Sequence, residues 1–482
     1  MGRVRRLPEA NGPNPFTNKI EYTTWRKVKL VAGAILLLPI RLLLNFVFMS
    51  IVYTCSRFSS WGWTPGTHLV WWQRILMTVV VPSVARVWLF LTFGYHWIPV
   101  KGRRASAKEA PIHIMSPHSS VIDSWMIYPY TFGSPLSRKE NSGVPFISAV
   151  ASASEPIWVD RSAKKSGSAV QEMVQRINLP GFWLPIVIFP EGTTHNAKSV
   201  LSFKTGAFSP GVPVQPILWR YDTPDVGVWE SFGLSLPFIF FHVMCQWNNS
   251  FEVEYLPVYV PSEQEKRDPV LYANNVRAVI ARALGRPVTD YALEDLRLCE
   301  IAHAAGLHED SGLLEYGLIH RLFDVRLPAL KTMLERFVRM NASKSGRVSR
   351  AEFLAALSWP VTEHANLLFA EYDTCSEDGA LRFREYVVGT LDLAEKVLEK
   401  QVLCRAAFAA LSAGHDALSV DSVLGAARER GLAALSTHHV EEFLRRVSRE
   451  HALDEAGFEE YVAANPDVNV LLQWFMHGTD SI

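Results

Sequence analysis

Two short polar runs interrupt apolar sequence and carry the residue types of an acid–base site: PHSSVID at 117–123 and FPEGTTHN at 189–196. In the first run His118 precedes Asp123 by five residues. Ser119 and Ser120 are types that begin helices, so we expect His118 just ahead of a helix that carries Asp123. The carboxylate would then accept the Nδ1–H of the imidazole and leave Nε2 free to take a proton. The alternative is that His118 only caps or packs at a helix start.

The first run favours chemistry without a protein nucleophile. No GxSxG elbow or candidate catalytic cysteine accompanies the histidine in the sequence. The two neighbouring serines suit helix caps better than nucleophiles. We therefore predict direct attack by a substrate hydroxyl, with His118 as general base.

The second run places a small-residue turn directly after the apolar segment PIVIF. Its backbone amides and the hydroxyls of Thr193 and Thr194 could hold phosphate oxygens. Glu191 is a poor phosphate ligand because like charges repel, so we expect it to bond to loop amides, a neighbouring base or a substrate hydroxyl. Lys204, in SFKTGAF, and Arg161, after PIWVD, could supply positive charge. Each basic residue taken singly is more often a solvated surface group.

An α/β domain must position these runs, and the sequence from about 99 to 300 is typical of one. Four apolar runs have the length and composition of strands, and two longer runs have the period of helices. The expected strands are Ile112–Met115, Pro185–Phe189, Val214–Trp219 and Phe251–Tyr259, and the expected helices are Ala169–Ile177 and Leu271–Leu284. The apolar segment 236–247 is too short to span a bilayer, so we interpret it as core or as an interfacial contact.

Ahead of this domain lie two long apolar runs, Leu30–Cys55 and Ile75–Ile98. The first would span roughly 39 Å as a helix, which is enough for a bilayer. Arg41 and Arg86 lie near the centres of the runs, each with a proline nearby, and a charge at mid-depth is costly. We therefore favour bent or shallow helices that return the chain to the side it came from, with two plain spans as the alternative. The basic flank at 26–29 predicts a cytosolic start.

After about residue 310 the chain is typical of paired helix–loop–helix units. A helix with one buried face is predicted around 330–338. Twelve-residue segments at 341–352 and 374–385 fit the EF-hand loop template, with glycine at position 6 and glutamate at position 12. Hydrophobic residues at position 8 recur at intervals of 33 to 37 residues, at Val348, Leu381, Leu418 and Leu453. We expect four repeats arranged as two pairs.

The candidate calcium ligands in these loops carry little charge. The first loop offers Asn341, Ser343, Ser345 and Glu352, and the second offers Thr374, Ser376, Asp378 and Glu385. Fewer carboxylates mean weaker binding, so we expect at most a weak calcium site. A structural module that packs against the catalytic domain or a partner is the favoured interpretation.

Composition narrows the classes of function. Lys+Arg and Asp+Glu both number 48 in 482 residues, so no charge excess points to nucleic acid. Hydrophobic residues make up 49%, and six of the fifteen tryptophans lie between residues 61 and 97, an enrichment typical of membrane interfaces. The five cysteines are scattered without metal-ligand spacing, which favours reduced thiols facing a cytosol.

Four segments carry a resemblance to a known family. PHSSVID, PIWVDRS, IFPEGTTHN and GVPVQPI stand in the order and approximate spacing of the four motifs of the glycerolipid acyltransferase superfamily. The chain more closely resembles the lysophosphatidylcholine acyltransferases of the 1-acylglycerophosphate acyltransferase type. That likeness continues through SFKTGAF and LPVYVPSEQEKRDPVLYANNVR into the EF-hand-like region.

The resemblance implies roles position by position. His118 would take the proton from the lysophospholipid hydroxyl, with Asp123 as its partner, and that hydroxyl would attack the thioester of acyl-CoA. The other matching positions are Arg161 for the acceptor phosphate, Glu191, Gly192 and Thr193 for the acceptor, and Val212, Pro213 and Val214 for the acyl donor. His195 lies outside the family pattern and receives no role.

Together, the residues and the resemblance predict a four-part organisation. We expect a disordered tail at 1–24, a membrane anchor of two bent helices at 25–98, a glycerolipid acyltransferase-type α/β catalytic domain at 99–310, and an all-α, EF-hand-like domain with four degenerate repeats at 311–482. The resemblance implies acyl-CoA as co-substrate, no catalytic cofactor, and an endoplasmic reticulum membrane with the catalytic domain facing the cytosol. The alternatives are an acceptor such as lysophosphatidic acid or lyso-platelet-activating factor, or a catalytically inactive EF-hand membrane adaptor.

Overall fold

The structure is a computed structural model, in which the chain divides into two compact units. It describes residues 14–18, 20–62, 64, 67, 69–143, 145–152, 154–159, 167–179, 182–221, 235–356, 369, 372–373, 379–392, 408, 411–412, 416–429, 445, 453–454, 456–458 and 460. The larger unit is Pro8–Trp359 with Arg382–Arg384, and the smaller unit is Met1–Leu7, Pro360–Leu381 and Glu385–Ile482.

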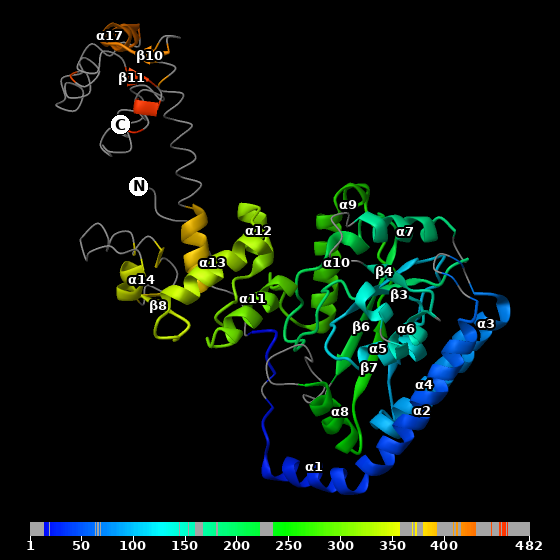
Figure 1. The fold of residues 1–482 in the computed structure, drawn as a ribbon. Coiled ribbons are helices and arrows are strands. Elements are labelled where there is room, and N and C mark those ends of the chain that lie inside the picture. The colour runs from blue at the N-terminus through cyan, green and yellow to red at the C-terminus, as the bar shows by residue number, and fades with distance from the viewer. Residues whose placement is uncertain are drawn as a thin grey trace. The chain divides into compact units, whose positions relative to one another are not determined.

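A mixed seven-stranded sheet lies at the centre of the larger unit (Figure 1). Its order is β1-β7-β6-β2-β5-β3-β4. Strands β2, β5 and β6 run parallel, whereas β7 is antiparallel to β6. The strands are β1 (Val100–Lys101), β2 (Ile112–Ser116), β3 (Ser134–Arg138), β4 (Ile157–Val159), β5 (Ile186–Ile188), β6 (Val214–Tyr221) and β7 (Phe251–Tyr255). The four strands expected from the sequence are confirmed as β2, β5, β6 and β7, with boundaries that differ by a few residues.

Helices cover both faces of this sheet. Val187, Ile217 and Trp219 point into one core with α4 and α8, while their neighbours Ile186 and Leu218 point into another with α7 and α10, as the two-residue period of a strand requires. The helices around the sheet are α4 (Val81–Phe93), α5 (Asp123–Met126), α6 (Pro145–Ser152), α7 (Gly167–Ile177), α8 (Leu236–Cys245) and α10 (Pro269–Leu284), with α9 (Glu263–Arg267) against α10 and the short helical segments η2 (Ile127–Thr131), η3 (Lys139–Gly143) and η4 (Thr205–Ala207). The expected helices at 169–177 and 271–284 are confirmed as α7 and α10.

The parallel strands bring the two polar runs to one edge of the sheet. Ile112 on β2 pairs with Ile186 on β5 and with Val214 on β6. The carboxyl ends of the three strands therefore lie together, and each opens into a loop or turn at that edge. Ligand sites in open α/β sheets form at this edge.

Two apolar N-terminal helices pack against each other and against the sheet. Among the described residues, Leu38–Ser59 and Trp71–Phe93 are long and apolar enough to cross a membrane. They comprise α2 (Leu38–Ser59) and, in the second stretch, α3 (Trp71–Ile75), the π-helical turn η1 (Leu76–Val80) and α4. Figure 1 shows α2 and α4 side by side. Trp88, Leu89 and Phe93 of α4 are buried in the core of the sheet, so these helices do not form a separate module.

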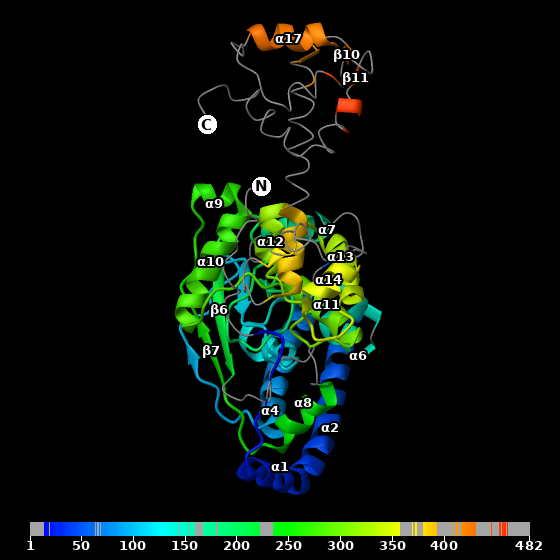
Figure 2. The same cartoon turned by 90° about the vertical axis from the view of Figure 1, so that its left-hand side faces the viewer.

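The first apolar run is bent, as the sequence analysis expected. Helix α1 (Thr24–Leu36) ends at a turn at Leu37, and α2 begins with Pro39 in its first turn. Helix α1 lies beneath α8 in both views (Figure 2). Gly33 allows this approach, because a Cβ there would lie 1.8 Å from the carbonyl oxygen of Cys245.

The two arginines in the apolar runs are paired with backbone carbonyls. Arg41 is buried and donates to the carbonyl of Met244 at 2.8 Å and to those of Gln246 and Trp247, at the carboxyl end of α8. Arg86 donates to the carbonyls of Tyr95 and His96, at 3.0 and 2.9 Å, just beyond α4. Arg41 therefore pairs with a carbonyl in the last turn of α8, which a helix end leaves without an intrahelical partner, whereas Arg86 pairs with loop carbonyls beyond α4.

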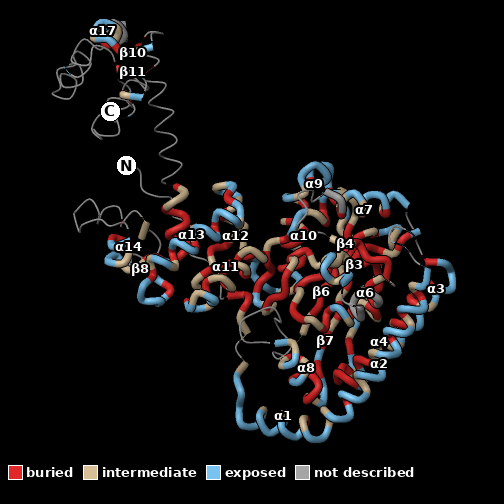
Figure 3. Tube along the Cα trace, in the orientation of Figure 1, coloured by how far each residue is buried: buried red, intermediate tan, exposed pale blue. Residues whose placement is uncertain are grey.

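Much of the surface of these helices is apolar and exposed. The exposed parts of α1, α2 and α4 appear as pale blue in Figure 3, whereas the strands are mostly red. The exposed residues include Trp25, Val31, Ile35, Leu36, Leu43, Phe46, Trp71, Val79 and Trp97. An apolar surface of this extent marks an interaction site, and a bilayer is the partner that suits two long apolar helices.

Residues 14–18 and 20–24 have a defined place in the structure, which corrects the expectation of a disordered tail for this part of 1–24. Phe16 is fully buried beside Leu201 and Tyr291. The Nδ2 of Asn196 donates to the carbonyls of Asn14 and Thr17 at 2.9 and 3.0 Å. The buried ring of Phe16 and the hydrogen bonds from Asn196 hold this segment in place, although its composition alone suggests disorder.

The larger unit continues into helices and the first EF-hand-like loop. The helices are α11 (Leu293–Ala304), α12 (Tyr316–Phe323), α13 (Leu327–Met340) and α14 (Arg350–Ala356), with β8 (Val348–Ser349) before α14. The buried face expected at 330–338 is confirmed in α13 by Leu330, Leu334 and Phe337. In the smaller unit the described elements are β9 (Ala380–Leu381), β10 (Ala417–Leu418), α17 (Val420–Glu429) and β11 (Leu453–Asp454).

Candidate active site

His118 and Asp123 meet at the carboxyl end of β2. His118 follows that strand by two residues, and Asp123 is the first residue of α5. Nδ1 of His118 lies 2.6 Å from Oδ2 of Asp123. An ionised carboxylate only accepts hydrogen bonds, so it holds the proton of the neutral imidazole on Nδ1. Nε2 has no partner among the residues that the structure describes, and the His118 side chain is 21% exposed.

Four donors fix the carboxylate of Asp123, which is fully buried. Besides His118, its Oδ2 accepts from the amides of Ser119 and Ser120 at 2.9 and 3.1 Å. Its Oδ1 accepts from the phenol of Tyr221, the last residue of β6. Burying a charge is costly unless it is hydrogen-bonded, so these donors are what allows a carboxylate at this position.

Glu191 joins the two polar runs. Its Oε2 accepts from the amide of His118 at 2.9 Å, and its Oε1 accepts from the hydroxyl of Ser116 at 3.1 Å. The amide of His195 donates to the carbonyl of His118 at 2.9 Å. The loop after β5 therefore holds the backbone of His118 on both sides. Because the Glu191 side chain is fully buried, it does not reach substrate in this arrangement.

His195, to which the sequence analysis gave no role, is the partner of Glu191. Its Nε2 lies 3.0 Å from Oε1 of Glu191. Its Nδ1 accepts the amide of Ala197 at 3.3 Å, so the proton of the neutral ring sits on Nε2, which faces Glu191 without the angle of a hydrogen bond. Burial would raise the pKa of the Glu191 carboxyl, but His195, the amide of His118 and the hydroxyl of Ser116 hold that pKa below its ordinary value.

The plane of the His118 ring is set by an aromatic stack. The ring lies on Phe189, with centroids 4.0 Å apart and an angle of 16° between the planes. Phe189 in turn meets Trp219 of β6 edge-on at 5.4 Å. The imidazole is thus fixed by a hydrogen bond at one nitrogen and by packing on one face.

The turn after β5 requires glycine but does not present its threonine hydroxyls. Gly192 has φ +70°, a left-handed conformation that favours glycine. Thr193 and Thr194 are 2% and 1% exposed. The hydroxyl of Thr193 donates to the carbonyl of Thr194, and that of Thr194 is buried with no partner among the residues whose placement is described. The expected phosphate contacts from these hydroxyls are therefore not available in this arrangement, because the loop is packed inward.

Of the two basic residues expected to supply positive charge, Lys204 lies among the described residues and Arg161 does not. Lys204 lies beside the turn, since its Cγ would be 3.9 Å from a Cβ on Gly192. Its Nζ is paired with both carboxylate oxygens of Glu294 on α11, at 2.7 and 2.8 Å. Arg161 lies outside the described residues.

The expected acyl-donor motif is not brought beside His118. Val214 is the first residue of β6 and is level with Ile112 on β2, whereas His118 follows the last residue of β2. Val214 is fully buried in the core, and the carbonyl of Val212 accepts from the phenol of Tyr272. Val212, Pro213 and Val214 therefore lie at the edge of the sheet opposite the candidate site.

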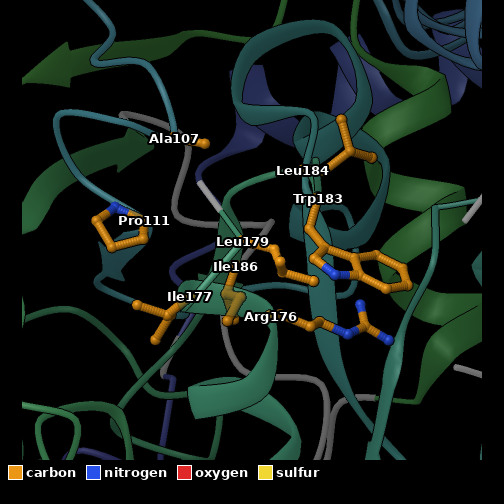
Figure 4. Close-up of a pocket in the computed structure, with 8 residues that line it drawn as sticks. All are labelled: Ala107, Pro111, Arg176, Ile177, Leu179, Trp183, Leu184 and Ile186. Atoms are coloured by element: carbon orange, nitrogen blue, oxygen red, sulfur yellow. The ribbon is translucent and has the colours of Figure 1, made fainter. Parts of the chain in front are cut away.

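A small pocket opens at that opposite edge (Figure 4). It is lined by Ala107, Pro111, Arg176, Ile177, Leu179, Trp183, Leu184 and Ile186. The guanidinium of Arg176 lies 4.5 Å from the ring centroid of Trp183 and pairs with Glu172 at 2.6 Å. Since Arg176 is already occupied and the pocket lies by the amino ends of β2 and β5, we do not include it in the candidate site.

The first EF-hand-like loop is closed by its own hydrogen bonds. Glu352 accepts from the amides of Ser343 and Ser349, both at 2.8 Å. Burial would raise the pKa of its carboxyl, but these donors lower that pKa to about 2. Ser343 bonds to Ser345, and neither side-chain polar atom of the buried Asn341 has a partner in the described ranges of the chain. In the second loop Glu385 is buried, while Thr374, Ser376 and Asp378 lie outside the described residues. Within the part of the chain that the structure describes, no group of three or more His, Cys, Asp or Glu side chains could hold a metal ion.

Comparisons with known proteins show what this chain is similar to. A family model described as "Acyltransferase" matches residues 98–220. Lysophosphatidylcholine acyltransferase 2 of Homo sapiens is 36% identical over 382 residues, which cover 78% of this chain and 70% of the relative. Lysophosphatidylcholine acyltransferase 1 of Danio rerio is 35% identical, covering 78% and 72% of the two chains, and that of Homo sapiens is 34% identical, covering 83% and 74%.

One solved structure is distantly similar. It is the 1-acyl-sn-glycerophosphate acyltransferase PlsC of Thermotoga maritima, at 17% identity and a TM-score of 0.35, covering 51% of this chain and 95% of that chain. We base no conclusion on a likeness of this size.

Proposed function

The chain belongs to the lysophosphatidylcholine acyltransferase family and is an acyltransferase, and from this premise we propose that it moves a fatty acyl group from acyl-CoA to the free hydroxyl of a lysophospholipid. Lysophosphatidylcholine is the proposed acceptor, because the most similar relatives carry that name. The observation that carries the mechanism is the pair of His118 and Asp123, with Nε2 of the histidine unpartnered at the carboxyl edge of the sheet.

In the proposed reaction His118 is a general base and then a general acid. Nε2 takes the proton of the acceptor hydroxyl as its oxygen attacks the thioester carbonyl carbon. The new ester bond forms, the carbon–sulfur bond breaks, and the departing thiolate receives the proton from Nε2. Asp123 stabilises the imidazolium between these two proton transfers, and it holds the ring in the required tautomer. The reaction needs no catalytic cofactor.

The proposed roles of the remaining site residues rest on different kinds of observation. Glu191 and Gly192 are proposed to shape the loop that holds His118, which agrees with their contacts and conformation. Lys204 is a candidate for the acceptor phosphate only if it leaves Glu294. Roles for Arg161 with the acceptor phosphate and for Val212–Val214 with the acyl donor rest on the family resemblance alone.

We propose that the enzyme sits on the cytosolic face of the endoplasmic reticulum membrane through a monotopic anchor. The bend at Leu37 and the capping of α8 by Arg41 tie the apolar helices to the catalytic unit. The exposed apolar residues of α1 and α2 would enter the leaflet from that side. Lysophospholipid would then reach the site from the membrane and acyl-CoA from the cytosol.

The proposed C-terminal module is an EF-hand-like domain that binds calcium weakly or not at all. Its support is the antiparallel pairing of Leu418 with Leu453, the position-8 residues of the third and fourth repeats, which is how paired EF-hand loops would meet. Glu352 is already saturated by loop amides, which leaves little for a cation.

The test of the proposed function is acyl transfer by the full chain in membranes, with and without His118. Wild-type membranes should release CoA from acyl-CoA in the presence of lysophosphatidylcholine, and His118→Ala should lower the rate by roughly 10²-fold or more. His308→Ala is a matched control, because His308 is 62% exposed in a loop away from the pair.

A panel of acceptors separates the alternatives. Transfer only to lysophosphatidic acid or lyso-platelet-activating factor would change the head group but keep the mechanism. Wild-type membranes that transfer to no acceptor would overturn the proposed substrates, and full activity in His118→Ala would overturn the base.

A further inference from the structure

Tyr221 stands at the catalytic pair although no sequence motif includes it. It is the last residue of β6, and the register that places Leu218 beside Ser116 carries β6 past the end of β2 to the level of the active-site loop. Its ring packs on Phe251, the residue of β7 that pairs with it in the sheet, with 4.7 Å between the ring centroids. From there its phenol donates to Oδ1 of Asp123.

The two carboxylate oxygens of Asp123 accept different numbers of hydrogen bonds. Oδ2 accepts from His118 and from the amides of Ser119 and Ser120. Tyr221 is the partner of Oδ1 among the residues that the structure describes. Two backbone amides therefore hold Oδ2 beside the imidazole, and the phenol acts on the carboxylate through Oδ1.

Tyr221 is also suited to remain a donor. Burial, followed by the charge of Asp123, raises the pKa of its phenol well above the ordinary value. The other titratable groups around the pair are Tyr95, which is buried after α4, and Glu191 and His195 from the loop after β5. Within the described part of the chain the phenol of Tyr95 makes no hydrogen bond, and the two loop residues contact the backbone of His118 rather than its ring.

We propose that Tyr221 is a positioning residue of the acyl-transfer site that acts through Asp123: its hydrogen bond to Oδ1 moderates the basicity of His118. This inference rests on the proposed function. A hydrogen bond to the carboxylate draws negative charge toward the phenol, so less is left to stabilise the imidazolium. Loss of the phenol should therefore strengthen the hold of Asp123 on the imidazolium.

The test is the pH dependence of kcat/KM in the full chain, which reports the ionisation of the free enzyme. In Tyr221→Phe the midpoint of the acidic limb should move to higher pH by about 0.5 to 1 unit, because a more basic His118 stays protonated further up the scale. At pH 6 the rate should fall by about three- to tenfold, and KM for acyl-CoA should not change.

Tyr255→Phe is the matched control. Tyr255 is a buried tyrosine on the neighbouring strand β7, and its phenol donates to the carbonyl of Tyr130 instead of to Asp123. It should lose a comparable amount of thermal stability while its acidic limb stays at the wild-type position. Equal shifts in both variants, or an unchanged limb in Tyr221→Phe, would overturn the inference.

A second variant keeps the test decisive if Tyr221→Phe fails to fold. Incorporation of 3-fluorotyrosine at position 221 keeps the ring and makes its hydroxyl a stronger donor, so the limb should move to lower pH. An unchanged limb or a shift to higher pH would contradict the proposed role. Failure of the proposed function is distinct from either result, since it would appear as wild-type protein that transfers no acyl group.

Discussion

His118 and Asp123 meet because the chain changes conformation between them. On a continuous helix, five residues would turn the two side chains roughly 140° apart. His118 instead lies in the loop after β2, and the helix begins only at Asp123. The carboxylate can then fold back over the amides of Ser119 and Ser120 and reach the imidazole. The spacing suits a strand-to-helix turn.

Glu191 is the residue through which the second run should affect the first. Glu191→Gln removes a charge and one acceptor while keeping the volume, so a donor among Ser116, His118 and His195 loses its partner. We expect a loss of about 1–3 kcal/mol in the free energy of unfolding at pH 7, and a lower kcat. Thermal unfolding in detergent and the acyl-transfer assay measure the two effects.

The same substitution has a pH signature. The pKa of Glu191 is lowered in the folded state, so the ionised form stabilises the fold above the ordinary pKa of 4.5, and this contribution is lost as pH falls through the lowered value. The difference between wild type and Glu191→Gln should therefore shrink below about pH 4.5. Glu109→Gln, an exposed ion pair with Arg103, should change stability little at any pH, and a constant difference for Glu191→Gln would refute the assignment.

At the scale of elements, the site exists because β2, β5 and β6 are parallel and end together. Their registers put the residues after Ser116, those after Ile188 and Tyr221 at one edge. The loop after β5 then turns sharply at Gly192 to bring Glu191 under His118. A change in that turn should therefore act on the catalytic pair through the backbone.

Gly192→Ala tests the turn. A Cβ at Gly192 has open space, with only Lys204 within 4 Å, so the cost comes from the positive φ and should be roughly 1–2 kcal/mol. Gly285→Ala is the control, since Gly285 has φ +63° and open space but ends α10. Both variants should lose similar stability in thermal unfolding, and only Gly192→Ala should also lose acyl transfer. Equal acyl-transfer activity of the two variants would show that the turn at Gly192 does not affect catalysis.

At the scale of the molecule, the apolar helices and the catalytic sheet form one unit. Helix α4 supplies Trp88 and Leu89 to the core that also holds Ile217 of β6. The arginines that seemed costly in a bilayer are bound to carbonyls of the same unit. The anchor therefore also orients the active site relative to the membrane surface in the proposed arrangement.

Arg41→Met distinguishes this arrangement from a plain span, because the two predict opposite signs. In a plain span, removing a charge at mid-depth should stabilise the helix by about 2.5–3.5 kcal/mol. With Arg41 bound to the carbonyls after α8, its loss should destabilise the protein by about 1–3 kcal/mol. Thermal unfolding in lipid bicelles measures the sign, and Arg57→Met, at an exposed position in the last turn of α2, serves as control.

The sequence by itself determined the local features of this protein. Apolar periodicity predicted the strands and helices around the site, because burial of a strand or helix face leaves its period in the residues. The sequence predicted a helix that carries Asp123 just after His118, and α5 begins at Asp123, but its N-cap is Ile122 and not one of the two serines. The ordered motifs predicted the family, which the comparisons confirm.

Only the tertiary structure decided which distant residues touch. The two polar runs are about seventy residues apart in the chain, and the parallel pairing of β2 with β5 joins them through Glu191. His195, Tyr221 and the buried Phe16 leave no local signal, since their roles depend on partners supplied by other elements. Arg41 shows the reason most clearly: a side chain's environment, and so its energy, is set by what packs against it rather than by its neighbours in sequence.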